Sequence, residues 1–164
     1  MNWPDDYLNK TICGDCRKVM RGIPDGSVDL ILTDPPYNLG KNYGGFSSDR
    51  LPEKKYWKWM KEVMSECYRV LGDGYCYVFN TDLGIFKLKP IMEKIGFTFR
   101  QLLIWYGKNG YGIRLKFGWA YRHEPFLMFT KGKADPLIGG KGLRWYTSVF
   151  EYPRPQSNFR ARRP

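Results

Sequence analysis

The chain has 164 residues, a length typical of one ordinary domain with a core of its own. Hydrophobic residues make up 43% and aromatic residues 17%, which excludes a disordered chain, because such chains lack the apolar content that offsets ordering entropy. No apolar run approaches the roughly 18 residues of a membrane span, and the N-terminus lacks the apolar centre of a secretory signal. We therefore expect a single cytoplasmic domain over residues 1–164, with no part in a membrane.

Positive charge is concentrated in the C-terminal part of the chain. The 27 basic and 16 acidic residues give a net charge of +11, and residues 101–164 hold 12 of the basic residues but only 3 of the acidic ones. Such an excess attracts polyanions through counterion release, so it favours a nucleic-acid partner over a basic surface that serves solubility alone. Residues 153–164 form an arginine-rich tail.

Strands and helices are expected to alternate. The apolar pattern predicts, in order, a short strand at 10–15, a short helix at 17–23, a strand buried on both faces at 27–34, a glycine-rich loop at 38–52, an amphipathic helix closed by Gly72 and Gly74, a strand at 74–80, a helix at 83–96, and strands at 97–107 and 123–132. This order predicts an α/β fold with a mainly parallel sheet and helices on both faces. Ligands of such sheets lie at the carboxyl ends of the strands.

The four cysteines give one CxxC pair, Cys13 and Cys16, and no second pair at metal-ligand spacing. A zinc site would need further ligands, so ordinary reduced thiols are the favoured interpretation and no metal is expected. His123, the only histidine, and Glu124 are interpreted as anchors of a strand end rather than as catalytic groups.

The end of the apolar run at 27–34 has unusual chemistry. Asp34 is followed by Pro35, Pro36 and Tyr37. Two successive prolines fix their own φ angles and hold the preceding residue in extended backbone, so a carboxylate, carbonyl oxygens and an aromatic ring form a rigid group of acceptors. Such a group suits the exocyclic amine of a base that has been flipped out of a duplex, although a strand end with a core tyrosine would show the same residues.

The segment TDPPYN at 33–38 resembles the catalytic motif of the amino-methyltransferases that methylate DNA bases with S-adenosylmethionine. The segments GDC at 14–16, DGSVDLILTDPPYNLG at 25–40, RVLGDGYCYVFN at 69–80 and RHEPFLMFTKG at 122–132 are similar in order and spacing to the class whose catalytic half precedes its cofactor-binding half. The resemblance implies a Rossmann-like methyltransferase fold. Aspartate at the first motif position implies adenine N6 as the acceptor.

The resemblance also implies roles for single residues. Asp34 and the Pro35 carbonyl would accept hydrogen bonds from the adenine amine, Pro36 would shape the turn, and Tyr37 would stack on the flipped base. Asp15 resembles an acid near the adenine of the cofactor, and Asp34 is also expected beside the cofactor. Asn38 either lines the pocket or bonds to the backbone of its own turn.

One departure from the family pattern stands out. A strand ending in an acidic residue and a glycine-rich turn, which receives the methionine end of the cofactor in relatives, is not found in these 164 residues. We therefore expect a catalytic half that needs a further segment or a second chain, and that exposes an unpaired strand edge and can self-associate. The alternative is a non-catalytic DNA-binding relic or subunit; methylation of RNA or of a protein amide is less favoured.

Residues 105–148 are the candidate DNA-contact region. Basic and aromatic residues alternate there, and cations bind phosphate while aromatic rings stack on bases. The candidate DNA-binding residues are Lys108, Arg114, Lys116, Arg122 and Arg144. The alternative is that the aromatic residues belong to the core beside a solvated charged face.

Overall fold

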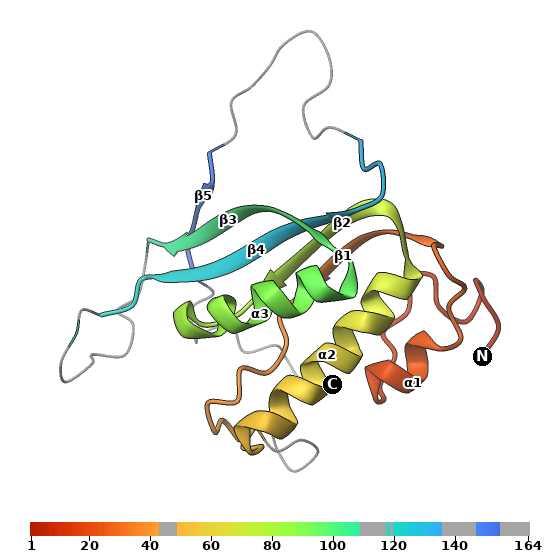
Figure 1. Ribbon diagram of the computed structural model, residues 1–164, viewed down its shortest axis with the longest axis horizontal. Helices are drawn as coiled ribbons and strands as arrows, with labels where there is room; N and C mark the ends of the chain where they lie inside the picture. The colour runs from red at the N-terminus through yellow and green to blue at the C-terminus, as the bar shows by residue number, and fades with distance from the viewer. Residues whose placement is uncertain (43–48, 109–117, 119, 136–146, 155–164) are drawn as a thin grey trace, which may run out of the picture.

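The computed structural model describes residues 1–42, 49–108, 118, 120–135 and 147–154. These residues form three helices and five strands (Figure 1). In chain order they are α1 (Cys16–Met20), β1 (Val28–Thr33), α2 (Glu53–Val70), β2 (Leu71–Phe79), α3 (Asp82–Ile95), β3 (Thr98–Gly107), β4 (His123–Lys131) and β5 (Val149–Tyr152). Most of the elements predicted from the apolar pattern are present, and the fold is α/β.

The five strands form one sheet in the order β1-β2-β4-β3-β5. β1 pairs with β2, and β3 with β5, in parallel, whereas β4 pairs with both β2 and β3 in antiparallel orientation. β1, β2, β3 and β5 therefore run in one direction, which confirms the predicted mainly parallel sheet. β4 inserts between two strands that precede it in the chain and is the one described strand that runs against the others.

The three described helices share one face of the sheet. The buried side chains of α2 and α3 form one core cluster with Cys76 and Val78 of β2. The alternate residues of β2, Tyr75 and Tyr77 among them, pack instead with a smaller cluster that contains no helix residue. Figure 1 shows α2 and α3 side by side beneath the sheet. Helices on both faces, as predicted, are not found among the described residues.

β1 lies at an edge of the sheet and is not buried on both faces. Leu30 is 54% exposed and Leu32 is 66% exposed, on the face that no described helix covers. Both residues pair with tyrosines of β2 that lie on the same face. The strand therefore exposes apolar side chains and, among the described residues, one row of unpaired backbone groups, as the expected open edge requires.

α2 has the predicted amphipathic pattern. Its buried side chains are Tyr56, Met60, Val63, Met64, Cys67 and Val70. The helix passes directly into β2 at Leu71, so Gly72 and Gly74, predicted to end the helix, lie within the strand. A Cβ atom at Gly74 would lie 2.2 Å from the carbonyl oxygen of Asp29, so glycine at this position permits the close approach of β1 to β2.

Two other elements differ from the prediction. Residues 10–15 form no strand, and their last residue is the N-cap of α1. β5 was not predicted, and its four residues are all exposed. In the described part of the chain, no helix has the length and apolar character needed to cross a membrane.

Candidate active site

The corner, residues 34–37, begins where β1 ends. The Asp34 side chain is exposed, Pro35 is buried, and Tyr37 is half-buried. The Tyr37 hydroxyl donates a hydrogen bond of 2.5 Å to Oδ1 of Asp34. Oδ2 of Asp34 accepts no hydrogen bond from the described residues. The corner therefore presents a carboxylate oxygen to solvent while an aromatic ring is held next to it.

The environment of Tyr37 keeps its hydroxyl protonated. Burial raises the pKa of Tyr37 well above its usual value, and the hydrogen bond to Asp34 and the negative charges of Asp34 and Glu124 raise it further. Glu124 lies in β4, at the start of the strand, and forms an ion pair of 3.0 Å with Arg154. Tyr37 therefore remains a hydrogen-bond donor to Asp34 at every physiological pH.

A buried polar chain holds the second proline of the corner. The hydroxyl of Tyr56, in the first turn of α2, donates a hydrogen bond of 2.9 Å to the Pro36 carbonyl. Nδ2 of Asn80 donates to the same hydroxyl over 3.4 Å. Tyr56 is 4% exposed and Asn80 is 1% exposed. Burial raises the pKa of Tyr56 above its usual value, so its hydroxyl also stays neutral.

Neither Tyr56 nor Asn80 was among the candidate residues predicted from the sequence. Tyr56 lies at a buried position of α2, where an aliphatic side chain is the usual choice. Asn80 directly follows β2, at the same edge of the sheet as the corner. A buried tyrosine or asparagine requires a hydrogen-bond partner, so the two polar residues were a usable signal.

The chain beyond the corner is fixed by its own polar groups. Asn38 has a φ of 62°, and its side chain exchanges two hydrogen bonds with the backbone of Leu51, of 2.8 Å and 2.7 Å. The buried Asp49 carboxylate accepts hydrogen bonds from the backbone amides of Asn38, Leu39 and Lys41. The Asn38 side chain thus serves the backbone of this loop.

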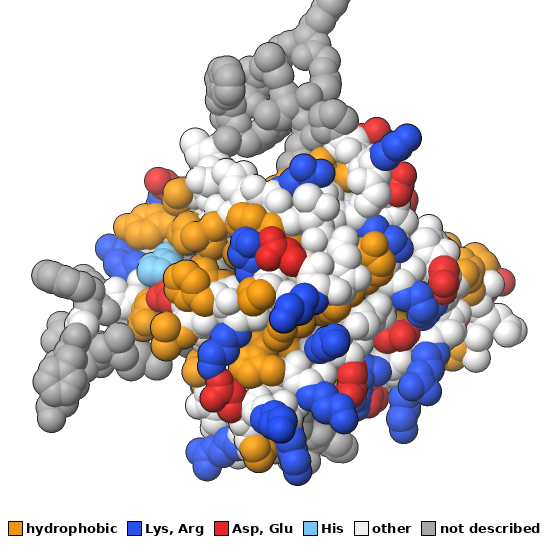
Figure 2. Space-filling view, viewed as in Figure 1, with side chains coloured by type: hydrophobic (Ala, Val, Ile, Leu, Met, Phe, Trp, Pro, Cys, Tyr) orange, Lys and Arg blue, Asp and Glu red, His pale blue; other side chains and the backbone are white. Residues whose placement is uncertain are grey.

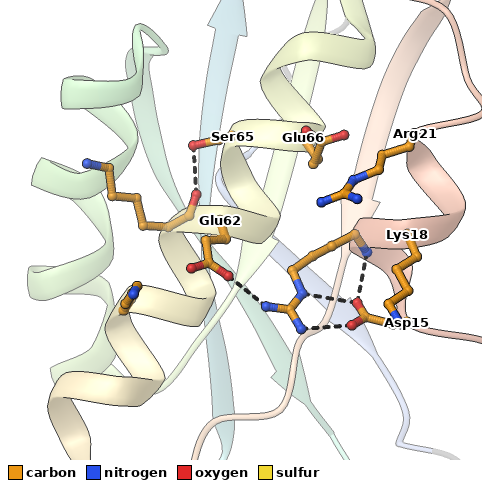
Figure 3. A pocket seen from close by; sticks show the side chains of 9 residues that line it. Asp15, Lys18, Arg21, Glu62, Ser65 and Glu66 are labelled. Carbon is orange, nitrogen blue, oxygen red and sulfur yellow. Dashed lines mark hydrogen bonds and ion pairs between the residues drawn. The ribbon is translucent and has the colours of Figure 1, made fainter.

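Asp15 is engaged by its own helix. Its carboxylate caps α1 by accepting from the Arg17 amide and forms an ion pair of 2.7 Å with the Arg17 guanidinium, which also binds Glu62 at 2.6 Å (Figure 3). The hydrogen bond from Arg17 lowers the pKa of Asp15 to about 2. No hydrogen bond among the described residues joins Asp15 to the corner, so its expected contact with a cofactor stays a prediction.

Two of the predicted DNA-binding residues lie in the described part of the chain. Lys108 is exposed and pairs with Glu151 at 2.8 Å, which raises the pKa of Lys108. Arg122 donates to the Lys108 carbonyl over 2.6 Å, and its guanidinium lies 5.2 Å from the centre of the Tyr106 ring. Arg122 therefore joins the end of β3 to the segment before β4, and only Lys108 extends toward solvent. The other three predicted residues, Arg114, Lys116 and Arg144, lie outside the described residues.

His123 and Glu124 are structural anchors, as expected. Nε2 of His123 lies 3.0 Å from Oδ1 of Asp82 and so joins the start of β4 to the first turn of α3. Glu124 anchors Arg154 at the end of the described chain. Both contacts lie at the edge of the sheet where β1 and β2 end, which is the edge that holds the corner.

Sequence comparison relates residues 28–162 to the DNA methylase family model. The chain is 37% identical over 140 residues to the type II methyltransferase M.BglII of Bacillus subtilis, covering 79% of this chain and 37% of that protein. It is 34% identical over 136 residues to the DNA adenine methyltransferase YhdJ of Escherichia coli, covering 82% and 45% respectively. The chain thus spans about two fifths of the length of these relatives.

Structural comparison finds similar folds. The PvuII DNA methyltransferase, which is cytosine-N4-specific, matches with a TM-score of 0.65 at 15% identity, covering 90% of this chain and 58% of that one. The M1.HpyAVI–SAM complex matches with a TM-score of 0.56 at 19% identity, covering 82% and 60%.

Proposed function

The chain belongs to the DNA methylase family, and we propose that it is the base-presenting region of an S-adenosylmethionine-dependent DNA methyltransferase that modifies adenine at N6. The structural matches confirm the Rossmann-like methyltransferase fold. The observation that carries the proposal is the placement of the exposed Asp34 carboxylate beside Tyr37 at the carboxyl end of β1. Adenine is proposed as the base for two reasons. The motif begins with aspartate, which by the family resemblance implies adenine N6, and one relative is named as a DNA adenine methyltransferase.

The corner matches the chemical requirement of this acceptor. The exocyclic amine of adenine is conjugated with the ring and is a poor nucleophile. Oδ2 of Asp34 and the Pro35 carbonyl can each accept one of its hydrogens, which draws the nitrogen toward tetrahedral geometry and localises its lone pair. Asp34 then stabilises the positive charge that develops on nitrogen during in-line displacement. Tyr37 keeps Oδ1 occupied and offers its ring to the flipped base.

The described residues fit the acceptor side of the reaction better than the cofactor side. S-adenosylmethionine supplies an electrophilic methyl group when it is bound. Asp15 is an exposed, ionised candidate for contact with it, although Arg17 engages that carboxylate. In the described part of the chain, no acidic strand end is followed by a glycine-rich turn, so we assign no residue to the methionine end. We propose that a further segment or a second chain supplies that part.

The test measures methyl incorporation into DNA after the chain is mixed with a polypeptide carrying the cofactor-binding half of a relative. We expect N6-methyladenine in the product, and a loss of at least about a hundredfold in Asp34→Ala, because one electrostatic stabiliser contributes a factor of that order. Asp29→Ala removes an exposed aspartate of β1 outside the corner and is the matched control. Incorporation that survives Asp34→Ala contradicts the assigned role, and N4-methylcytosine contradicts the assigned base.

A second candidate function, a non-catalytic DNA-binding subunit, is supported by the net charge of +11 and by the lack of an assigned residue for the methionine end. Equilibrium dialysis separates the two functions. If the chain is a catalytic region, its mixture with the complementing half binds radiolabelled S-adenosylmethionine, and a substitution in the corner lowers the affinity of the mixture for this cofactor. A binding subunit leaves the affinity of the complementing half unchanged.

A further inference from the structure

A groove of about 650 Å³ lies between α1 and α2 (Figure 3). Eight of its nine lining residues are charged and the ninth is a serine: Asp15, Arg17, Lys18, Arg21, Lys58, Lys61, Glu62, Ser65 and Glu66. Small organic ligands are usually held against apolar or aromatic side chains, and none of the residues that line this groove is of either kind. Its lining fits a charged, hydrated ligand.

The acidic side chains of the groove all form ion pairs within the protein. Arg17 pairs with Asp15 at 2.7 Å and with Glu62 at 2.6 Å. Glu66 pairs with Arg69 at 2.9 Å. The three carboxylates of the groove are therefore engaged by two arginines, of which one lies outside the lining.

Four cations of the groove form no ion pair with an acidic residue in the described part of the chain: Lys18, Arg21, Lys58 and Lys61. All four are exposed. Lys18 and Arg21 are three residues apart, as are Lys58 and Lys61 in α2, a spacing that places Cβ atoms on a helical turn about 5–6 Å apart. The groove thus has one pair of cations on each wall, and Figure 2 shows Lys and Arg side chains gathered over this part of the molecule.

We propose that the groove between α1 and α2 binds the phosphate backbone of the DNA duplex. The inference rests on the proposed function and extends the DNA contact beyond the corner. Within each pair the two cations are about one helical turn apart, a spacing that suits successive phosphates of one strand. A single compact anion would instead need all four cations to converge on one point. α2 carries both Tyr56, whose hydroxyl holds the corner, and the cation pair of one wall of the groove, so one helix links the two places.

The experiment compares two triple variants in binding to a fluorescein-labelled 20-base-pair duplex, measured by anisotropy between about 50 and 300 mM salt without cofactor. The groove variant carries Lys18→Gln, Lys58→Gln and Lys61→Gln. The control variant makes the same chemical change at three exposed lysines outside the groove, Lys10, Lys94 and Lys133. Circular dichroism and melting temperature check that both variants are folded.

We expect the slope of log affinity against log salt to fall by about 2 to 3 in the groove variant, because each lost phosphate contact removes about 0.9. At about 100 mM salt the affinity of the groove variant for the duplex should fall at least about tenfold. If each of the three lysines neutralises one phosphate in the wild type, the loss reaches about 500-fold. The control should change by less than about threefold. Equal losses in both variants would overturn the inference, since net charge alone would then explain binding.

Two further outcomes overturn the inference. One is a wild-type chain that does not bind the duplex at all. The other is a groove variant that binds DNA normally but no longer binds vesicles containing phosphatidylserine, which would assign the groove to a membrane surface. Methyl incorporation is measured separately, so a groove variant with normal DNA binding leaves the proposed reaction standing, and an inactive chain leaves the groove assignment standing.

Discussion

The hydrogen-bond chain behind the corner can be tested by removing one oxygen atom. Tyr56→Phe deletes a hydroxyl that donates to the Pro36 carbonyl over 2.9 Å and accepts from Asn80 over 3.4 Å. The shorter bond is of ordinary length, whereas the longer one lies beyond the usual range and contributes less. The ring itself, which is 4% exposed, is retained, so the loss of apolar burial is small.

The size of the effect follows from desolvation. A hydrogen bond contributes a net stabilisation of about 0.5–1.5 kcal/mol, and a buried polar group left without its partner costs about 1–3 kcal/mol. The Asn80 side chain retains its second bond, in which Oδ1 accepts from the Thr81 amide at 2.8 Å. We therefore expect Tyr56→Phe to lower the free energy of unfolding by about 1–3 kcal/mol. At about 2–4 °C per kcal/mol, the melting temperature should fall by roughly 2–12 °C.

The assay is urea unfolding followed by circular dichroism, with Tyr68→Phe as the matched control. Tyr68 is half-buried, and its hydroxyl forms no hydrogen bond with the described residues, so the control should stay within about 0.5 kcal/mol of the wild type. A Tyr56→Phe variant as stable as the wild type would refute the claim that this hydroxyl holds the corner. In the complemented enzyme, the same variant should lower kcat more than it raises KM, because it displaces the acceptor oxygens rather than removing a contact with DNA.

Two further predictions concern parts of the chain outside the corner. Arg17 lowers the pKa of Asp15 to about 2, so the ion pair stabilises the fold fully above the ordinary pKa of about 3.8 and stops doing so as pH falls through 2. In thermal melts, the melting temperature of Asp15→Asn should lie slightly below that of the wild type at pH 7, and the difference should vanish near pH 2. A difference in melting temperature that does not depend on pH would contradict the ion pair. The exposed edge strand β1 should make the isolated chain self-associate, and sedimentation at micromolar concentration should show oligomers. Leu30→Lys and Leu32→Lys should each convert these oligomers to monomer. A wild-type chain that is monomeric and has a sharp unfolding transition would contradict this prediction.

The corner and most of the helices and strands could be predicted from the sequence because their signals are local. An apolar run followed by two prolines indicates a strand end, and buried positions three and four apart indicate the α2 helix, whatever the rest of the chain does. The motif at Asp34 likewise carries its chemistry within four residues. These features needed no knowledge of the sheet.

Which strand pairs with which, and what covers each face, depended on the tertiary structure. The apolar run of β4 indicates burial but not direction. Its insertion between β2 and β3 rests on contacts between residues far apart in the chain. The apolar run of β1 indicated burial on both faces, yet its outer face is left exposed because the described helices pack on the other side.

The partners of the corner were also decided by the fold alone. Tyr56 follows Pro36 by 20 positions and Asn80 follows Tyr56 by 24, so no local pattern places the tyrosine hydroxyl under the proline carbonyl. Only the packing of α2 against the end of β2 brings these atoms within hydrogen-bonding distance. The sequence by itself determined which chemical groups stand at the end of β1. The tertiary structure determined what holds them there, because only packing brings residues this far apart in the chain together in a buried site, where a hydrogen bond is strong.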